Sequence, residues 1–214
     1  MKIIMLGSPG TGKGTYSSRL SPILRIPHIS TGDIFRENIA KKTELGKKVE
    51  KFLDSGELVP DYITVEVVKE RLKKPDCKNG FILDGFPRTI KQAQELDKIT
   101  KIDFVVNLNV PKWLILERFS TRRTCKNCGE IYDIRSIKPK KEGICDRCGG
   151  QLIKREDETP KSIEKRLKVY NENTKPLIDY YKNKGILLNA SCNKLDSPPE
   201  LNVKKILNLL GVIK

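Results

Sequence analysis

Short apolar runs alternate with longer amphipathic stretches along most of the chain. The runs have the length of buried strands and lie at 3–6, 26–29, 81–83, 104–108 and 186–188. Apolar residues at helical spacing follow them at 13–24, 61–74, 111–120 and 159–184, and again after Pro198. This alternation predicts an α/β fold with a doubly wound parallel sheet.

Two polar segments interrupt the alternation. Residues 30–59 carry two short helical patterns, which Ser30 or Thr31 and then Thr43 can cap. Residues 121–158 have no long apolar periodicity. The predicted organisation is therefore a core of residues 1–29, 60–120 and 159–214, with one insert at 30–59 and another at 121–158. In the core we expect Trp113, Leu114 and Leu116 to pack inside, and Pro176 to bend the long helix.

The first apolar run leads into the glycine-rich segment Gly7-Ser-Pro-Gly-Thr-Gly-Lys13. Glycines allow successive backbone N–H groups to point at phosphate oxygens, and the helix that follows adds its positive end. The spacing G-x-x-x-x-G-K is that of the P-loop. Gly14 stands where that motif expects Ser or Thr, and the hydroxyl comes one place later at Thr15. A phosphate site is predicted, without the usual magnesium ligand at Gly14.

The third apolar run ends in a carboxylate, Asp84, and Gly85-Phe-Pro-Arg88 follows. Open α/β sheets bind ligands at the carboxyl ends of their strands, and an acid at such an end handles magnesium or its water shell in P-loop proteins. Arg118 and Arg122 lie four residues apart, so we expect them on one helix face. His28, the only histidine, is expected to pack in the core or at the edge of a cleft.

Four of the six cysteines fall into two pairs with the spacing C-x2-C-x16-C-x2-C, formed by Cys125, Cys128, Cys145 and Cys148. This spacing predicts a tetrahedral zinc site in which protein fills all four positions, so the metal is structural. The metal would replace the core that this small insert lacks. Two alternatives stay open at this stage: a zinc ribbon that reads nucleic acid, and an insert that has lost its metal. Cys77 and Cys192 are expected to be incidental.

The chain has 214 residues, 37% of them hydrophobic, and 42 Lys and Arg against 27 Asp and Glu, a formal net charge of +15. This excess attracts polyanions such as nucleotides, nucleic acid or acidic membranes, without choosing among them. Because Met1 leads directly into a strand and no apolar run approaches the length of a membrane span, we expect no secretory signal, no membrane partner and a cytoplasmic protein.

Four segments together resemble the adenylate kinase family, and the similarity spans nearly the whole chain: Gly7–Thr15, Ser30-Thr-Gly-Asp-Ile-Phe-Arg36, Leu83-Asp-Gly-Phe-Pro-Arg88 and Arg122-Arg-Thr-Cys125. The Gly-Lys-Gly-Thr ending is typical of that family, and the cysteine pairs resemble those of its members with a long, zinc-bearing lid. The resemblance implies a P-loop NTPase-type sheet of five parallel strands, an AMP-binding insert at 30–59 and a zinc-binding lid at 121–158.

The resemblance also implies roles for individual residues. ATP would be held by Gly10, Thr11, Gly12, Lys13, Gly14, Thr15, Arg118, Arg122, Ile131, Tyr132 and Lys194. AMP would be held by Thr31, Arg36, Glu57, Leu58, Val59, Gly85, Phe86, Pro87, Arg88, Gln92, Arg155 and Arg166. The catalytic residues would be Lys13, Asp84, Arg88, Arg122, Arg155 and Arg166. Asp157 matches the first of two lid acids, whereas the second is Glu158 in place of the usual Asp.

The implied reaction is the reversible phosphoryl transfer ATP + AMP = 2 ADP, with Mg2+ bound to ATP and a structural Zn2+. We expect a monomer whose partners are ATP, AMP and ADP, with no nucleic acid. A UMP/CMP-type nucleoside monophosphate kinase is the first alternative. The second is a P-loop ATPase that binds nucleic acid through the cysteine insert. Against it, the inserts carry few aromatic residues for base stacking.

Overall fold

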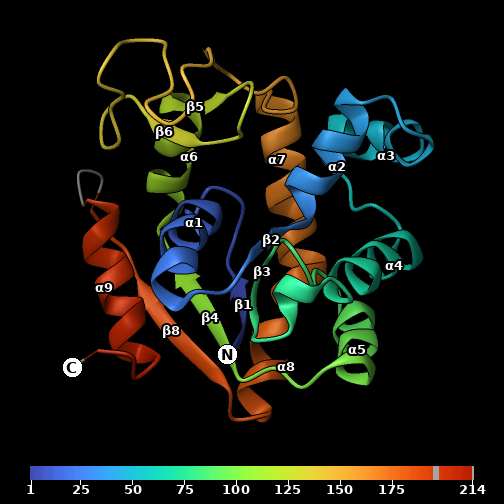
Figure 1. Ribbon diagram of the computed structural model, residues 1–214. Helices are drawn as coiled ribbons and strands as arrows, with labels where there is room; N and C mark the ends of the chain where they lie inside the picture. Colours follow the sequence, from blue (N-terminus) through green and yellow to red (C-terminus); the bar gives the residue numbers. More distant parts are fainter. Residues whose placement is uncertain (195–197, 214) are drawn as a thin grey trace.

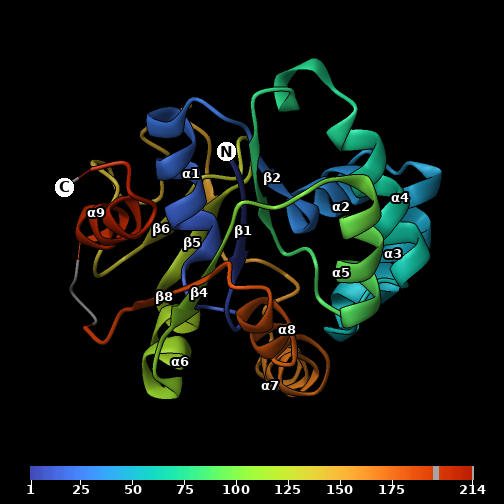
Figure 2. The same ribbon diagram turned by 90° about the horizontal axis from the view of Figure 1, so that it is seen from below.

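A five-stranded parallel sheet lies at the centre of the molecule, in the order β2-β3-β1-β4-β8 (Figures 1 and 2). The computed structural model describes residues 1–194 and 198–213. The strands are β1 (Lys2–Leu6), β2 (His28–Ser30), β3 (Phe81–Asp84), β4 (Phe104–Asn109) and β8 (Leu187–Ser191). Met5 of β1 and Ser30 of β2 both stand opposite Asp84, so these three strands end level at one edge. The predicted fold class is confirmed.

Successive side chains of a strand point to opposite faces of the sheet, so alternate residues of these strands pack into two separate cores. Ile4, Leu83 and Val105 belong to one buried cluster, and Ile3, Ile82 and Val106 to the other. The first cluster includes residues of α4 (Asp61–Leu72), α5 (Ile90–Ile99) and α8 (Leu177–Asn183). The second includes residues of α1 (Lys13–Leu24) and α9 (Pro199–Leu209), which lie on the opposite face (Figure 1). Helices thus cover both faces.

Helices α2 (Thr31–Ala40) and α3 (Glu44–Ser55) form a pair with a small cluster of its own around Phe35, Val49 and Val59. Ser30 caps α2 by accepting from the N–H of Asp33, and Thr43 caps α3 by accepting from the N–H of Gly46. The pair projects to one side of the sheet (Figure 1).

A three-stranded antiparallel sheet in the order β6-β5-β7 lies beyond the carboxyl edge of the main sheet (Figure 1). Its strands are β5 (Arg122–Cys125), β6 (Ile131–Asp133) and β7 (Leu152–Ile153). It follows α6 (Lys112–Thr121) directly and precedes α7 (Pro160–Val169). A single 3-10 turn, Pro75–Cys77, joins α4 to β3.

Two expectations differ from the structure. In α6, Leu114 is fully buried, but Trp113 is 54% and Leu116 is 46% exposed. The helix buries Leu114, Ile115 and Phe119, which leaves its other face open. The helix expected over 159–184 is divided into α7 and α8 by a π-helical turn at Tyr170–Thr174, where the N–H of Lys175 bonds to the carbonyl of Tyr170. Pro176, which has no N–H, stands just after this turn.

The contact between α2 and α3 leads to a prediction about Gly46. A Cβ at this position would lie 2.2 Å from the backbone oxygen of Asn38. Gly→Ala inside a helix normally stabilises by about 1 kcal/mol, but here the two helices must move apart. We expect Gly46→Ala to lower the free energy of unfolding by about 1–3 kcal/mol, measured by denaturant titration. Lys48→Ala, an exposed change in the same helix, is the control and should shift stability by less than about 0.5 kcal/mol. Stabilisation by Gly46→Ala would contradict this packing.

Candidate active site

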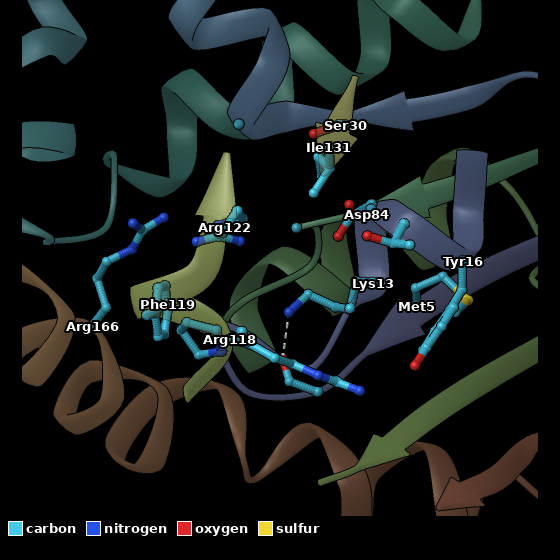
Figure 3. Close-up of a pocket in the computed structure, with 18 of the residues that line it drawn as sticks. Met5, Lys13, Tyr16, Ser30, Asp84, Arg118, Phe119, Arg122, Ile131 and Arg166 are labelled. Atoms are coloured by element: carbon cyan, nitrogen blue, oxygen red, sulfur yellow. Dashed lines mark hydrogen bonds between the residues drawn. The ribbon is translucent and has the colours of Figure 1, made fainter. Parts of the chain in front are cut away.

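The glycine-rich loop joins β1 to the start of α1 and curls around the side chain of Lys13. The Lys13 ammonium donates to the backbone oxygens of Gly7 at 2.7 Å and Ser8 at 3.0 Å (Figure 3). Gly10 and Gly12 have φ angles of +84° and +96°, which only glycine adopts without strain. The loop therefore presents backbone N–H groups and the N-terminus of α1 beside one cation, the arrangement that binds phosphate.

Burial lowers the pKa of Lys13 to about 8, even though the nearby Asp84 carboxylate acts to raise it. The guanidinium groups of Arg88, Arg166 and Arg122 lower it further. The charged form of Lys13 is therefore costly in the free protein, and an anion bound in the loop would make that form favourable again.

Asp84 ends β3 near Lys13 of the glycine-rich loop (Figure 3). Its carboxylate lies 3.5 Å from Nε2 of His28. Burial acts to raise the pKa of Asp84, but His28 and the Lys13 charge outweigh it and hold that pKa below its usual value. Gly14 lies against this carboxylate: a Cβ would be 3.3 Å from Oδ2 of Asp84 and 3.2 Å from Ile131. A side chain at this position would crowd Asp84 and Ile131, so glycine fits here where the motif expects Ser or Thr.

Guanidinium groups from six separate segments face the same cavity, and several are fixed by backbone or side-chain oxygens. Arg88 donates to the carbonyl of Gly85 at 2.8 Å, and Arg118 donates to that of Thr11 at 2.9 Å. The cavity measures about 190 Å³, and both ends of the loop line it. Figure 3 shows Arg118, Arg122 and Arg166 around it. The arginines that line it are Arg36, Arg88, Arg118, Arg122, Arg155 and Arg166. The sequence spreads these residues over 130 positions (166 − 36), and the fold brings them together.

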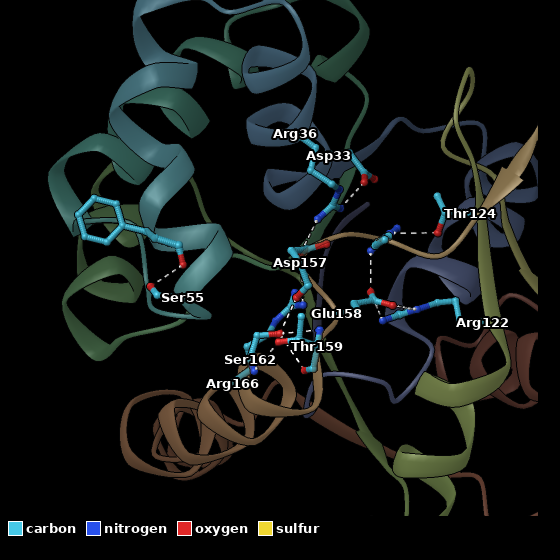
Figure 4. A network of polar contacts seen from close by, with 12 residues as sticks. Asp33, Arg36, Ser55, Arg122, Thr124, Asp157, Glu158, Thr159, Ser162 and Arg166 are labelled. Atoms are coloured by element: carbon cyan, nitrogen blue, oxygen red, sulfur yellow. Dashed lines mark hydrogen bonds and ion pairs between the residues drawn. The ribbon is translucent and has the colours of Figure 1, made fainter.

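Two acids just before α7 hold several of these cations in place (Figure 4). The Glu158 carboxylate, almost fully buried, binds Arg122 through two nitrogens and lies 3.6 Å from Arg155. Asp157 lies 3.4 Å from Arg166 and 4.0 Å from Arg36. These contacts join β5, α2 and α7 to one short segment, so the acids of that segment oppose the repulsion among the arginines.

Burial also lowers the pKa values of two of these guanidinium groups. The pKa of Arg88 falls to about 10, with the charge of Arg166 adding to the effect of burial. The pKa of Arg155 falls to about 10, with Arg36 and Arg122 contributing after burial. Each of these cations would be stabilised by an anionic ligand with several oxygens, and arginine binds such groups in two places.

A smaller pocket of about 40 Å³ shares its wall with the main cavity at Arg36, Gly85, Arg88 and Arg166. Thr31, whose hydroxyl donates to the carbonyl of Gly85 at 3.0 Å, also lines it. Its remaining walls come from the turn after α3 and from α5, with Glu57, Leu58, Val59 and Gln92. The two cavities therefore form one continuous site beside the sheet edge.

Most residues predicted from the sequence line one or both cavities. The predicted residues that line the main cavity are Gly10, Gly12, Lys13, Gly14, Thr15, Arg36, Leu58, Asp84, Gly85, Pro87, Arg88, Arg118, Arg122, Ile131, Tyr132, Arg155 and Arg166. Within the described part of the chain, three of the residues predicted to bind nucleotide line neither cavity. Thr11 is buried behind the loop and receives Arg118, Phe86 lies in the first core cluster, and Lys194 follows β8 on the surface.

Tyr132 lines the cavity, but its hydroxyl points away toward the cysteines. It accepts from the N–H of Asp146 at 2.8 Å and lies 3.6 Å from Sγ of Cys145. The ring is only 5% exposed. Tyr132 thus links the wall of the cavity to the cysteine cluster.

Four thiols gather at the end of the small sheet, from Cys125, Cys128, Cys145 and Cys148, and all four Sγ atoms lie within 4.8 Å of one another. Two of the S–S separations are 3.4 Å and 3.6 Å. Tetrahedral zinc with bonds of about 2.3 Å requires sulfurs about 3.8 Å apart, so the donors fit that geometry. The cluster could hold one metal ion, and protein would supply all four ligands.

Sequence reasoning missed several side chains at the site. Asp33 pairs with Arg36 at 2.5 Å, and Asp61 accepts from Gln92 at 2.7 Å. Cys192, expected to be incidental, receives a bond from Arg118 at 3.2 Å, and Tyr16 lines the cavity beside it. Asp33 and Asp61 stand in the first turns of helices, so in sequence they look like ordinary helix-start residues. Only the tertiary contacts reveal their partners.

Comparison with known proteins gives one consistent name. The family model described as adenylate kinase matches residues 5–186. An adenylate kinase of Caldicellulosiruptor bescii is 53% identical over 99% of this chain and 100% of its own length. The adenylate kinase of Clostridium tetani is 52% identical over 100% of both chains, and that of Archaeoglobus fulgidus is 50% identical over 91% of this chain and 92% of its own.

None of the helices in residues 1–194 and 198–213 is both long and apolar enough to cross a membrane.

The lowered pKa of Lys13 can be measured. A folded-state pKa of about 8 against 10.5 means that the unfolded chain binds more protons between these values. This group alone therefore makes the free energy of unfolding rise with pH in that window. In NMR of lysine-labelled protein, with Lys13→Arg assigning the signal, we expect a midpoint near pH 8 that moves upward when inorganic tripolyphosphate binds. An ordinary midpoint in the free protein, or no shift with the anion, would contradict the burial argument.

Proposed function

The chain belongs to the adenylate kinase family, and on this basis we propose how its residues divide the transfer of a phosphoryl group from ATP to AMP. It is an enzyme, a nucleoside monophosphate kinase that catalyses ATP + AMP = 2 ADP. The observation that carries the assignment of roles is the gathering of Lys13 and the arginines around one two-part cavity at the carboxyl edge of the sheet.

The larger cavity is proposed to hold ATP. The loop from Gly10 to Thr15 would receive its phosphates, with Lys13 as the fixed cation. Arg118, Ile131 and Tyr132 would lie along the rest of the nucleotide. Lys194 would contact the base through its backbone, as the resemblance implies. The support is that the loop and the α6–β5 junction line the same cavity.

The smaller pocket is proposed to hold AMP. Thr31 and the segment Glu57–Val59 would face the base with Gln92, and Arg36 and Arg88 would bind the phosphate. Arg88 lines both cavities, as do Arg36 and Arg166. The phosphoryl group that passes from ATP to AMP would therefore contact these arginines where the two cavities meet.

Phosphoryl transfer needs positioning and neutralisation of charge more than covalent chemistry. The AMP phosphate is already an anionic nucleophile, so we propose no general base. Lys13, Arg88, Arg122, Arg155 and Arg166 would stabilise the charge that develops on the transferred group. Glu158 holds Arg122 and lies beside Arg155, so it would release them to phosphate oxygens as the site fills.

The two inserts are proposed to act as moving parts: residues 30–59 for AMP and residues 121–158 as a lid. Closure would exclude water, which otherwise competes with AMP for the phosphoryl group. Support comes from two ion pairs of Asp157, which lies in the insert 121–158. One joins it to Arg36 of the insert 30–59, and the other joins it to Arg166 of α7.

Enzymes of this family use ATP as its magnesium complex, and the ion would neutralise charge on the phosphate oxygens. The donor that fits here is the carboxylate of Asp84, because His28 and Lys13 outweigh the effect of burial and hold its pKa below the usual value. We propose that Asp84 contacts the ion through water. Gly14, which stands where the motif has Ser or Thr, offers no side-chain ligand of its own. The four cysteines are proposed to bind Zn2+ as a structural ion, and we propose that the enzyme acts as a cytoplasmic monomer.

The alternatives named from the sequence are not favoured, because the family model and the relatives carry the single name adenylate kinase. A coupled assay with ATP, magnesium and a panel of AMP, CMP and UMP tests the acceptor directly. We expect ADP formation with AMP, and no stimulation of ATP hydrolysis by RNA or DNA. Failure to form ADP from ATP and AMP would reject the assignment.

The position of Arg88 at the junction of the two cavities predicts a large kinetic effect. Arg88→Ala should lower kcat by about 10³-fold, by analogy with arginine fingers, because the charge on the transferred group loses a fixed cation. Arg147→Ala, which removes an exposed arginine that lines neither cavity, is the control and should leave kcat unchanged. A loss below tenfold for Arg88→Ala would show that the residue is misassigned.

The structural role of the metal predicts a difference between stability and activity. Removing it with a chelator should lower the melting temperature markedly while much of the activity at low temperature remains, because the ion supports the lid and touches no substrate. Cys145→Ser should do the same, whereas Cys77→Ser, at an equally buried cysteine outside the cluster, should have a smaller effect. Unchanged melting after verified metal removal would refute this role.

A further inference from the structure

Gln92 lines the smaller pocket, and two groups fix its carboxamide. The backbone N–H of Arg88 donates to Oε1 at 2.7 Å, and Nε2 donates to Oδ1 of Asp61 at 2.7 Å. Gln92 is 1% exposed. An N–H group can only donate and a carboxylate can only accept, so the oxygen must face Arg88 and the nitrogen must face Asp61. The chemistry of the partners alone therefore sets the orientation of the amide.

Asp61 is itself held from two directions. It is the first residue of α4, where the helix dipole favours a carboxylate. The hydroxyl of Thr89, which caps α5 by accepting from the N–H of Gln92, donates to the same Oδ1 at 3.2 Å. Helices α4 and α5 lie side by side (Figures 1 and 2). The amide is thus mounted between two packed helices and cannot turn over without losing two bonds.

The two hydrogen bonds together use half of the hydrogen-bonding capacity of the carboxamide. A primary amide has two N–H donors and two lone pairs, so one N–H and one lone pair remain. The Watson–Crick edge of adenine presents an acceptor at N1 beside the 6-amino donor, which complements that pair. Hypoxanthine presents N1–H beside the 6-oxo acceptor, which opposes donor to donor and acceptor to acceptor.

We infer that Asp61 is a specificity-determining positioning residue, which keeps Gln92 oriented to accept a 6-aminopurine monophosphate and to reject a 6-oxopurine. The inference rests on the proposed AMP site. It extends to pyrimidines: cytosine carries the same edge pattern as adenine, and uracil carries that of hypoxanthine. The fixed amide therefore excludes IMP and UMP, while CMP is excluded only by the fit of a smaller base.

The test compares AMP with IMP, which differ mainly at this edge. Affinities by calorimetry and kcat/KM are measured for the wild type, Asp61→Leu and Asp61→Asn. Asp61→Leu removes the acceptor but keeps a similar shape, so the ratio of AMP to IMP should fall about tenfold or more, the usual effect of a hydrogen bond to a charged group. Asn retains an acceptor oxygen toward Nε2, so Asp61→Asn should keep the ratio within about threefold.

The ratio separates positioning from simple stability. If Asp61→Leu weakens AMP and IMP equally, or leaves both unchanged, the inference is overturned and Asp61 serves only the packing of α4 on α5. Melting curves of the same variants record that packing independently. If the wild type phosphorylates AMP and Asp61→Leu leaves the ratio of AMP to IMP unchanged, only this inference is overturned. A wild-type enzyme that does not bind AMP overturns the proposed acceptor site as well.

Discussion

Repulsion among positive charges is the constraint on which the rest of the active site depends. One lysine and five arginines come close enough for their charges to act on one another: Lys13, Arg36, Arg88, Arg122, Arg155 and Arg166. In the free protein the acids of the segment before α7 and backbone carbonyls offset part of this cost. On the proposed assignment of the site, bound phosphates would relieve the unfavourable remainder, so the repulsion among the cations would favour substrate binding.

The fold keeps these charges together because their backbones belong to rigid elements. The loop of Lys13 and the turn of Arg88 both leave the level edge formed by β1 and β3. Arg36 and Arg166 lie on helices α2 and α7, which Asp157 links. A cluster built on strand ends and helices holds its geometry better than one built on free loops, and the buried sheet beneath it resists displacement.

Much of this arrangement could be predicted from the sequence. The strands, the helix cap at Thr43 and the glycine-rich loop follow from local patterns, and the structure confirms them. The spacing of the cysteines likewise predicted a cluster able to hold a metal. The predicted roles of individual residues came from the resemblance, and the structure adds that most of them share one site.

What the sequence could not supply were the partners that position those residues. Neither the contact of Glu158 with Arg122 nor that of Asp61 with Gln92 has a local pattern, since the pairs are separated by 36 and 31 positions and meet only through tertiary structure. The exposure of Trp113 and Leu116 could not be predicted either, because an apolar pattern shows which residues are apolar but not which face of the helix other elements cover.

The wide turn at Tyr170–Thr174 has a consequence for how this chain tolerates insertions and deletions. The turn contains one more residue than an α-helical turn would, and within it the hydroxyl of Thr174 reaches the carbonyl of Arg88 at 2.9 Å. Losing one residue of this turn would restore a regular α-helix with nearly the same total rotation, whereas losing one residue within α7 would rotate everything downstream by about 100°. In the second case Tyr181, now fully enclosed, would turn toward water. The wide turn is therefore the position in this segment at which the chain can lose one residue while α8 keeps its orientation on the sheet.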